Sequence, residues 1–165
     1  VVSGCGRPDP APSPAAPSGK RLAFGGHEIY YEVHGQGPRT LVFIHGWTGN
    51  LQVWKNQLDA FPGYRCIGLD LPGNGQSSRR EGVPYTMELF ADSVRAVLDE
   101  EKIDQAIFFG HSMGFAVTEV IAAKYPQRCL GLAAIDGAHF AVSADPDSPE
   151  KFQQENAAFA TGVDI

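Results

Sequence analysis

The pentapeptide Gly-His-Ser-Met-Gly at residues 110–114 constrains the fold of this chain more than any other feature. It follows the short apolar run 106–109, which is typical of a buried strand, and precedes a helix predicted over 113–125, which a proline ends. A strand that turns directly into a helix has a strained backbone at the turn and needs small neighbouring residues. The pattern predicts an α/β fold in which Ser112 projects from the tip of a sharp turn.

A serine at such a turn is well placed for nucleophilic chemistry. The backbone N–H of Met113 lies at the positive end of the predicted helix, where it can face a negatively charged oxygen beside Ser112. Turns of glycine and serine also arise without any catalytic role, so the pentapeptide on its own leaves a structural role open. Its meaning depends on the residues that follow the other apolar strands.

Two more apolar runs are each followed directly by a loop with polar residues. The run 41–44 is followed by His45-Gly46-Trp47, and the run 67–69 is followed by Asp-Leu-Pro-Gly-Asn-Gly-Gln-Ser at 70–77. The order and spacing of these three strand-and-loop units closely resemble the α/β-hydrolase fold superfamily. The resemblance extends over roughly residues 21–136.

The resemblance implies an α/β fold with a mostly parallel sheet flanked by helices. The superfamily sheet has about eight strands, and about six of them are predicted in this chain. The expected hydrolase core, residues 21–139, is therefore incomplete, and residues 140–165 are expected to begin a cap inserted after the sixth strand. The predicted strands are approximately Leu22–Gly25, Glu28–Val33, Thr40–His45, Arg65–Leu69, Gln105–Gly110 and Leu130–Asp136.

The resemblance also implies roles for residues at the turn. Ser112 is implied to be the nucleophile that forms an acyl-enzyme. The backbone N–H groups of Trp47 and Met113 are implied to form the oxyanion hole, and the Trp47 side chain an apolar wall of the acyl pocket. The residues implied to form the framework of the turn are Gly110, His111 and Gly114.

The identity of the nucleophile narrows the reaction. Relatives that open epoxides or displace halide use an aspartate at this position to form an alkyl ester, whereas Ser112 indicates acyl transfer. Hydrolysis of a small carboxylic ester-like substrate is the leading interpretation. Lactone, amide or carbon–carbon bond hydrolysis and peroxidase-like peroxyacid formation are variants of the same chemistry. A non-catalytic binding or scaffold protein with this fold is the alternative from another class.

Two nearby residues are expected to be structural, and a third departs from the superfamily pattern. Asp70 is interpreted as a hydrogen-bond acceptor within its loop, and His45 as a framework residue. Phe115 stands where many members of the superfamily carry a second glycine. Its bulk raises the question of how tightly the helix packs on the sheet at that point.

The general base and its orienting acid are not identified in this chain. In the superfamily they follow the nucleophile in the order Asp or Glu, then His, and come from strands after the sixth. The only histidine after Ser112 is His139, and a compressed pair of Asp136 and His139 is the weaker alternative because one short loop would hold both. We expect the acid and base beyond Ile165, in a longer protein. The chain alone is then expected to be inactive and to expose its sixth strand as an apolar edge.

The first part of the chain, residues 1–20, differs in composition from the rest. Val2-Ser3-Gly4-Cys5 resembles the bacterial lipobox, in which small residues precede a cysteine that becomes lipidated. Residues 7–20 are rich in proline, alanine and serine, which is typical of an extended tether. These features predict a lipid anchor at Cys5 that holds the protein on a membrane of the bacterial cell envelope, facing outward or the periplasm. The alternative is a cytoplasmic protein whose tail carries an incidental cysteine.

Charge and cysteine spacing argue against other classes of function. The formal net charge is −6 and no basic stripe is present, so no binding to nucleic acid is expected. No spacing suits a metal site, and neither a metal nor a cofactor is predicted; the expected partner is a small ester-like substrate. Cys66 and Cys129 are predicted to be core residues. A disulfide between them is the weaker alternative, since the superfamily sheet does not place their strands side by side.

Two further helices are predicted from apolar residues at helical spacing, and both are expected to pack on the sheet. Thr86 is the predicted N-cap of the second helix, and a polar helix is expected at 150–160 in the cap segment. The apolar residues are Leu51, Trp54, Leu58 and Phe61 in the first helix, and Phe90, Val94, Val97 and Leu98 in the second.

Overall fold

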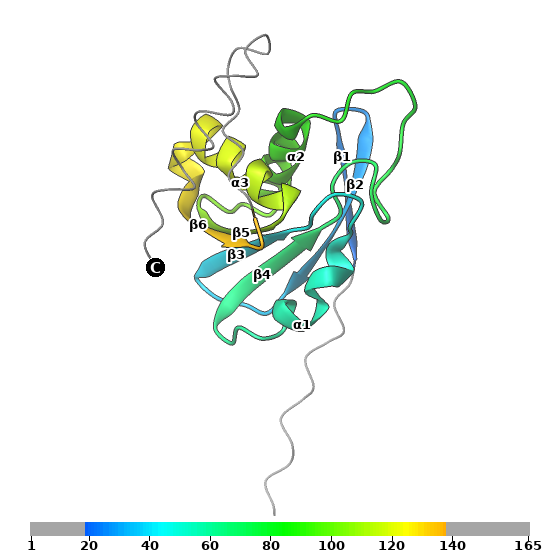
Figure 1. The fold of residues 1–165 in the computed structure, drawn as a ribbon. Helices are drawn as coiled ribbons and strands as arrows, with labels where there is room; N and C mark the ends of the chain where they lie inside the picture. The colour runs from blue at the N-terminus through cyan, green and yellow to red at the C-terminus, as the bar shows by residue number, and fades with distance from the viewer. Residues whose placement is uncertain (1–18, 138–165) are drawn as a thin grey trace, which may run out of the picture.

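The computed structural model describes residues 19–137, which form one six-stranded sheet with flanking helices (Figure 1). All six predicted strands are present, and their ends lie within two residues of the prediction. The predicted lipidation site Cys5, the histidine His139 and the cap segment 140–165 lie outside the described residues. The strands are β1 (Lys20–Phe24), β2 (His27–His34), β3 (Arg39–Ile44), β4 (Tyr64–Leu69), β5 (Ala106–His111) and β6 (Cys129–Ile135).

The direction of the strands brings the three predicted loops together. The strand order is β1-β2-β4-β3-β5-β6. β1 is antiparallel to β2 and β2 is antiparallel to β4, whereas β4, β3, β5 and β6 run parallel. At the end of β3, Ile44 lies opposite Leu69 of β4 and Gly110 of β5. Because parallel strands end at the same edge of a sheet, the loops after β3, β4 and β5 emerge side by side.

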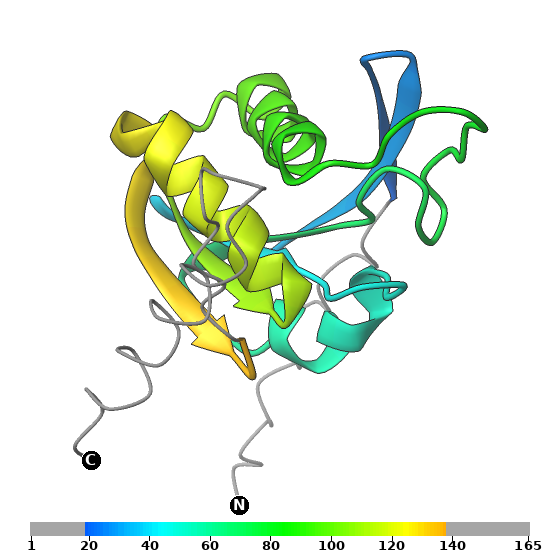
Figure 2. The same ribbon diagram turned by 45° about the horizontal axis from the view of Figure 1, so that its top comes forward.

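Helices cover both faces of the sheet. The helices α2 (Met87–Glu100) and α3 (Met113–Lys124) pack side by side on one face, and η1 (Leu51–Trp54) and α1 (Lys55–Leu58) lie on the other (Figure 2). A short helix, η2 (Pro126–Arg128), leads from α3 into β6. Thr86 caps α2 as predicted, because its Oγ1 accepts a hydrogen bond from the Leu89 N–H at 3.2 Å.

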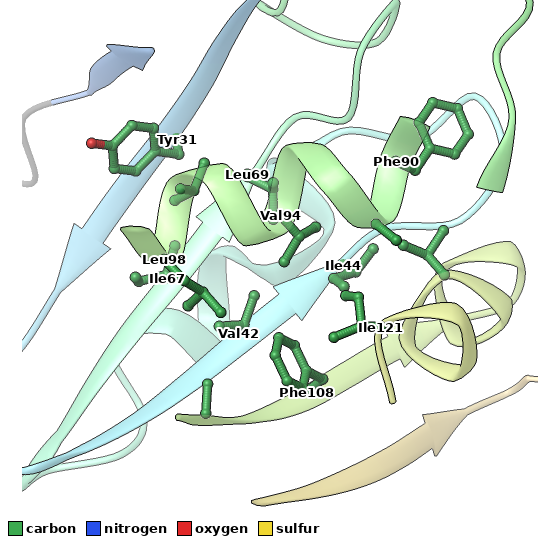
Figure 3. Packing of buried hydrophobic residues seen from close by; sticks show 14 of the residues in the cluster. Tyr31, Val42, Ile44, Ile67, Leu69, Phe90, Val94, Leu98, Phe108 and Ile121 are labelled. Atoms are coloured by element: carbon green, nitrogen blue, oxygen red, sulfur yellow. The ribbon is translucent and has the colours of Figure 1, made fainter. Parts of the chain in front are cut away.

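The larger hydrophobic core lies between the sheet and the pair α2 and α3 (Figure 3). Val42 and Ile44 of β3 belong to this core, whereas Leu41 and Phe43 belong to a smaller core on the η1 and α1 side. β3 is apolar along most of its length because a central parallel strand is buried on both faces. The labelled members of the larger core are Tyr31, Val42, Ile44, Ile67, Leu69, Phe90, Val94, Leu98, Phe108 and Ile121.

The predicted first helix is wrong in form. η1 is a 3-10 helix, α1 is a single turn of α-helix, and Phe61 lies beyond both. The proline that follows Phe61 disfavours a helical backbone at that residue, so the helix ends early. The predicted apolar residues are nevertheless buried, at 1% exposure for Leu51, 5% for Trp54 and 2% for Leu58, and Phe61 packs against the same cluster.

β6 forms one edge of the described sheet, as predicted. Among strands of residues 19–137 it pairs only with β5. Its large apolar side chains are exposed, at 51% for Leu130, 38% for Leu132 and 41% for Ile135. An edge strand with free backbone groups and exposed apolar side chains is a surface on which another strand can pair.

Cys66 is buried in the smaller core, whereas Cys129 is partly buried against the larger one. Cys66 on β4 and Cys129 on β6 are free, and the strands β3 and β5 separate them. The alternative of a disulfide between them is therefore wrong. Burial raises the pKa of the Cys66 thiol to about 11, so this group is held as the neutral thiol. Among the helices of residues 19–137, none combines the length and apolar character that crossing a bilayer requires.

Candidate active site

Ser112 occupies the strained turn that the sequence predicted. It lies between the last residue of β5, His111, and the first residue of α3, Met113. Its backbone has φ 51° and ψ −120°, a conformation that costs a residue other than glycine roughly 1–3 kcal/mol. The side chain is exposed, so its hydroxyl is accessible at the carboxyl edge of the sheet.

The glycines two residues before and after Ser112 allow close backbone approach, Gly114 to the end of β3 and Gly110 to the start of α3. A Cβ on Gly114 would lie 2.4 Å from the Ile44 carbonyl oxygen, and a Cβ on Gly110 would lie 2.5 Å from the backbone nitrogen of Phe115. Neither approach leaves room for a side chain, because the opposing atoms are backbone atoms that cannot turn away. Glycine is therefore the residue that fits at both positions.

The loop after β3 passes directly beside Ser112. A Cβ on Gly46 would lie 3.2 Å from the Ser112 Cβ and 2.9 Å from the His111 Nδ1, so any larger residue would require these side chains to shift. The next residue, Trp47, has a side chain that is 67% exposed. The structure assigns no hydrogen-bond acceptor within residues 19–137 to the backbone N–H of Trp47 or of Met113. Gly46 is a site residue whose closeness to the serine was not predicted.

His45 connects the loops after β3 and β4 through both ring nitrogens. Its side chain is buried, Nε2 accepts a hydrogen bond from the Leu71 N–H at 3.0 Å, and Nδ1 donates to the Gly46 carbonyl oxygen at 2.8 Å. Burial lowers the pKa of His45, which keeps the ring neutral and able to accept from Leu71. This arrangement agrees with a framework role and leaves neither nitrogen free to move a proton.

Asp70 holds two loops with one carboxylate. Its Oδ1 accepts from the Leu51 N–H at 2.6 Å and its Oδ2 accepts from the Gln76 N–H at 2.6 Å. The side chain is 1% exposed, and the Asp70 carbonyl oxygen also accepts from the Ser77 hydroxyl at 2.6 Å. Asp70 therefore acts as the hydrogen-bond acceptor that the sequence predicted, and it fixes the start of η1 immediately after the Trp47 loop.

Two residues beside the serine have packing roles. The His111 ring lies edge-on to Trp54, with ring centroids 6.5 Å apart and an interplanar angle of 84°. Phe115 is buried against Gly137, where a Cβ would lie 2.7 Å from the Phe115 Cβ. The phenyl ring in place of a second glycine is therefore accommodated by a glycine after β6, and α3 packs tightly on the sheet.

Asp136 follows β6 close to the turn. The carbonyl oxygen of Ile135 accepts from the Ser112 N–H at 3.2 Å, and Asp136 has a positive φ of 49°. The side chain of Asp136 is exposed. Its proposed partner His139 is outside the described residues, so the compressed pair of Asp136 and His139 stays an untested alternative. Within residues 19–137, no three side chains of His, Cys, Asp or Glu gather in a way that could hold a metal ion.

A model of the alpha/beta hydrolase fold family matches residues 39–164, which include the turn and both neighbouring loops. The chain belongs to the alpha/beta hydrolase fold family. This membership confirms the expected fold class, in which a mostly parallel sheet carries its loops at one edge.

Several curated proteins are similar to this chain. A dihydrolipoyllysine-residue acetyltransferase component of an acetoin cleaving system from Cupriavidus necator is 37% identical over 128 residues, covering 77% of this chain and 34% of that protein. A pimeloyl-[acyl-carrier protein] methyl ester esterase from Yersinia enterocolitica is 30% identical over 135 residues, covering 78% of this chain and 50% of that protein. The chain thus spans about a third to a half of the length of these relatives.

A solved structure is also similar to this chain. The structure of Est816, an N-acyl homoserine lactone degrading enzyme, has a TM-score of 0.70 and 28% sequence identity, covering 87% of this chain and 55% of that chain.

Proposed function

We propose that this protein is a serine hydrolase that cleaves small carboxylic ester-like substrates through an acyl-enzyme on Ser112. The observation that carries the proposal is the position of Ser112, which is exposed on a strained turn between β5 and α3 with the Gly46 backbone against its Cβ. Nucleophiles of this fold sit on such a turn. The strain is a reason to expect a functional residue there.

The proposed reaction proceeds in two steps. In the first, the Ser112 Oγ loses its proton to a general base and attacks the substrate carbonyl carbon, and the backbone N–H groups of Trp47 and Met113 stabilise the negative oxygen. The ester C–O bond then breaks and the alcohol leaves with the proton. In the second step water attacks the acyl-enzyme, which releases the carboxylic acid and restores the serine.

We place the general base and its orienting acid after Ile165. The chain spans only about a third to a half of the similar proteins, and the family draws both residues from later in the chain than the nucleophile. His45 does not serve as the base in this proposal, because both of its ring nitrogens are hydrogen-bonded within the framework. In this scheme residues 21–139 are the first part of the catalytic core, and residues 140–165 begin the cap.

The similar proteins favour ester and lactone substrates within the acyl-transfer class. The Yersinia relative is named for cleavage of a methyl ester, and Est816 for degradation of an acyl lactone, which is a cyclic ester. Both reactions attack an acyl carbon, which suits a serine nucleophile. Lactone hydrolysis is therefore the second candidate, and it uses the same Ser112 and the same two backbone donors.

Labelling with a fluorophosphonate probe tests the assignment of Ser112. We expect the full-length protein to be labelled and Ser112→Ala to abolish labelling. Ser93→Ala is the matched control, because Ser93 is buried on α2 and donates to the Phe90 carbonyl oxygen, away from the turn. Absence of labelling in the wild-type protein would support a non-catalytic binding protein instead, whereas labelling that survives in Ser112→Ala would show that the reactive nucleophile is another residue.

We further propose that Cys5 carries a lipid that holds the protein on a membrane of the bacterial cell envelope. The support is the resemblance of residues 2–5 to a lipobox and the proline-rich segment 7–20. Mass spectrometry of the N-terminal peptide of the full-length protein checks this proposal. We expect a lipid mass on a peptide that begins at Cys5, and we expect globomycin, which blocks cleavage before the lipidated cysteine, to leave the preceding residues attached. An unmodified Cys5 would leave a cytoplasmic location as the better explanation.

A further inference from the structure

A small cavity lies between the loop after β3 and the loop after β4. Its volume is about 220 Å³. The walls that matter here are apolar and come from Trp47, Pro72, Tyr85 and Phe90, and the main charged group at the cavity is Arg79. Pockets for whole ligands usually measure about 300–1,000 Å³, so this cavity is of a size for one arm of a substrate.

The cavity is next to the candidate nucleophile. Trp47, one of its walls, follows Gly46, and a Cβ on Gly46 would lie 3.2 Å from the Ser112 Cβ. Trp47 also supplies one of the two backbone N–H groups that we propose for the oxyanion hole. The cavity and the proposed oxyanion hole therefore share Trp47.

Arg79 is held at the cavity by backbone and not by an acid. Its Nε and Nη2 donate to the Gly73 carbonyl oxygen at 3.3 and 3.1 Å. No carboxylate within the described part of the chain forms an ion pair with Arg79. A guanidinium carries further N–H donors in a planar fork that suits a carboxylate, so the remaining donors are available to a ligand.

We propose that this cavity binds the acyl arm of the substrate and that Arg79 selects an arm that is short, apolar and ends in a carboxylate. The proposal rests on the proposed hydrolase function of Ser112. The apolar walls suit the methylene groups of the arm, and Arg79 suits its charged end. The formal net charge of the protein is −6, so the electrostatic field of the whole protein does not favour an anionic ligand. Selection for an anion in this cavity therefore depends on the guanidinium of Arg79.

Arg80 provides a matched control. It is the next residue in the chain and carries the same charge, but it does not line the cavity. Its Nη1 lies instead beside Gly26, where a Cβ would be 2.2 Å away. Arg79→Met and Arg80→Met therefore change the net charge equally, and only the first removes the cation from the cavity.

The experiment compares two esters in the full-length protein. One is mono-p-nitrophenyl adipate, whose acyl arm ends in a carboxylate, and the other is the same ester with a carboxamide in place of the carboxylate. We expect wild-type kcat/KM to favour the carboxylate ester by roughly tenfold, which corresponds to one charge-assisted hydrogen bond. Arg79→Met should remove this preference by lowering kcat/KM for the carboxylate ester alone, and Arg80→Met should retain it.

The outcomes separate this proposal from the hydrolase function. If neither ester is cleaved in a Ser112-dependent manner, the proposed function has failed. If both esters are cleaved but the wild-type protein shows no preference, or Arg79→Met and Arg80→Met have equal effects, the hydrolase function stands and the role of Arg79 is overturned. Retained cleavage of the carboxamide ester by Arg79→Met shows that this variant is folded.

Discussion

Asp70 and His45 show how single side chains set the backbone around Ser112. The Asp70 carboxylate accepts from Leu51 at the start of η1, and His45 accepts from Leu71 in the next loop. Both side chains are buried and both act on backbone N–H groups. Their contribution to the site is therefore to hold the segment that carries Trp47. We expect a substitution of either residue to change the position of that segment.

Asp70→Asn tests this positioning role. Both neighbours of the carboxylate are N–H donors, and asparagine offers one oxygen and one NH₂ group, so one donor loses its acceptor. We expect the free energy of unfolding to fall by about 1–3 kcal/mol and fluorophosphonate labelling of Ser112 to slow. Urea denaturation and labelling rates measure the two effects. Asp104→Asn, at an exposed aspartate after Ile103, is the control, and equal behaviour of the two variants would refute the role of Asp70.

The sequence predicted the residues of the turn but not the cavity beside it. Ser112, Met113 and Trp47 could be named because each follows an apolar strand in a fixed local pattern. The place of Arg79 depends on how the loop after β4 folds back on Gly73 and lies across from Trp47. The cavity is lined by residues of two loops that are separate in the sequence, and no local periodicity encodes how those loops come together.

Among the elements, the end of α2 is tied to three strands through Glu101. Its carboxylate accepts from the Lys20 ammonium of β1 and the Tyr31 hydroxyl of β2, each at 2.7 Å, and pairs with Arg65 of β4. The Glu101 side chain is only 6% exposed. Burial alone would raise the pKa of Glu101, but the hydrogen bonds from Lys20 and Tyr31 and the nearby positive charges lower it below its ordinary value of 4.5.

The lowered pKa of Glu101 predicts a pH dependence of stability. Because the folded-state pKa lies below 4.5, the ionised carboxylate stabilises the fold above that pH, and the contribution is lost as pH falls through the folded-state value. We expect Glu101→Gln to lower the free energy of unfolding by about 1–3 kcal/mol near pH 7, with a smaller difference from wild type in acid. Denaturation across this pH range tests the prediction, with the exposed Glu100→Gln as control. A difference that grows in acid would contradict it.

A helix or strand could be predicted where the residues within it determine its backbone conformation. The strands and α2 were predicted because buried strands need apolar runs, and α2 has one apolar face and a capping threonine. The lengths of η1 and α1 were not predicted. The spacing of Leu51, Trp54 and Leu58 suits a 3-10 turn followed by an α-turn as well as one continuous helix. The apolar positions alone do not distinguish these backbones.

For the whole molecule, the exposed edge at β6 predicts self-association of the isolated chain. We expect residues 21–165, expressed alone, to associate through this edge, and Leu132→Lys to reduce the association, because lysine on an edge strand disfavours pairing. Val53→Lys, at a 54% exposed residue on η1, is the control with the same added charge. Analytical ultracentrifugation measures the effect. A monomer that unfolds cooperatively and cleaves esters would be the opposite result.

The strained turn at Ser112 affects which residue is expected at this position when variants are selected for stability or for activity. Glycine adopts a positive φ without the steric cost that serine bears, so Ser112→Gly would relax the backbone and stabilise the fold by roughly 1 kcal/mol, a several-fold change in the ratio of folded to unfolded molecules. Libraries screened only for thermal stability are therefore expected to accumulate glycine at this position. Libraries screened for turnover are expected to keep serine, so the residue found at 112 reports which property was under selection.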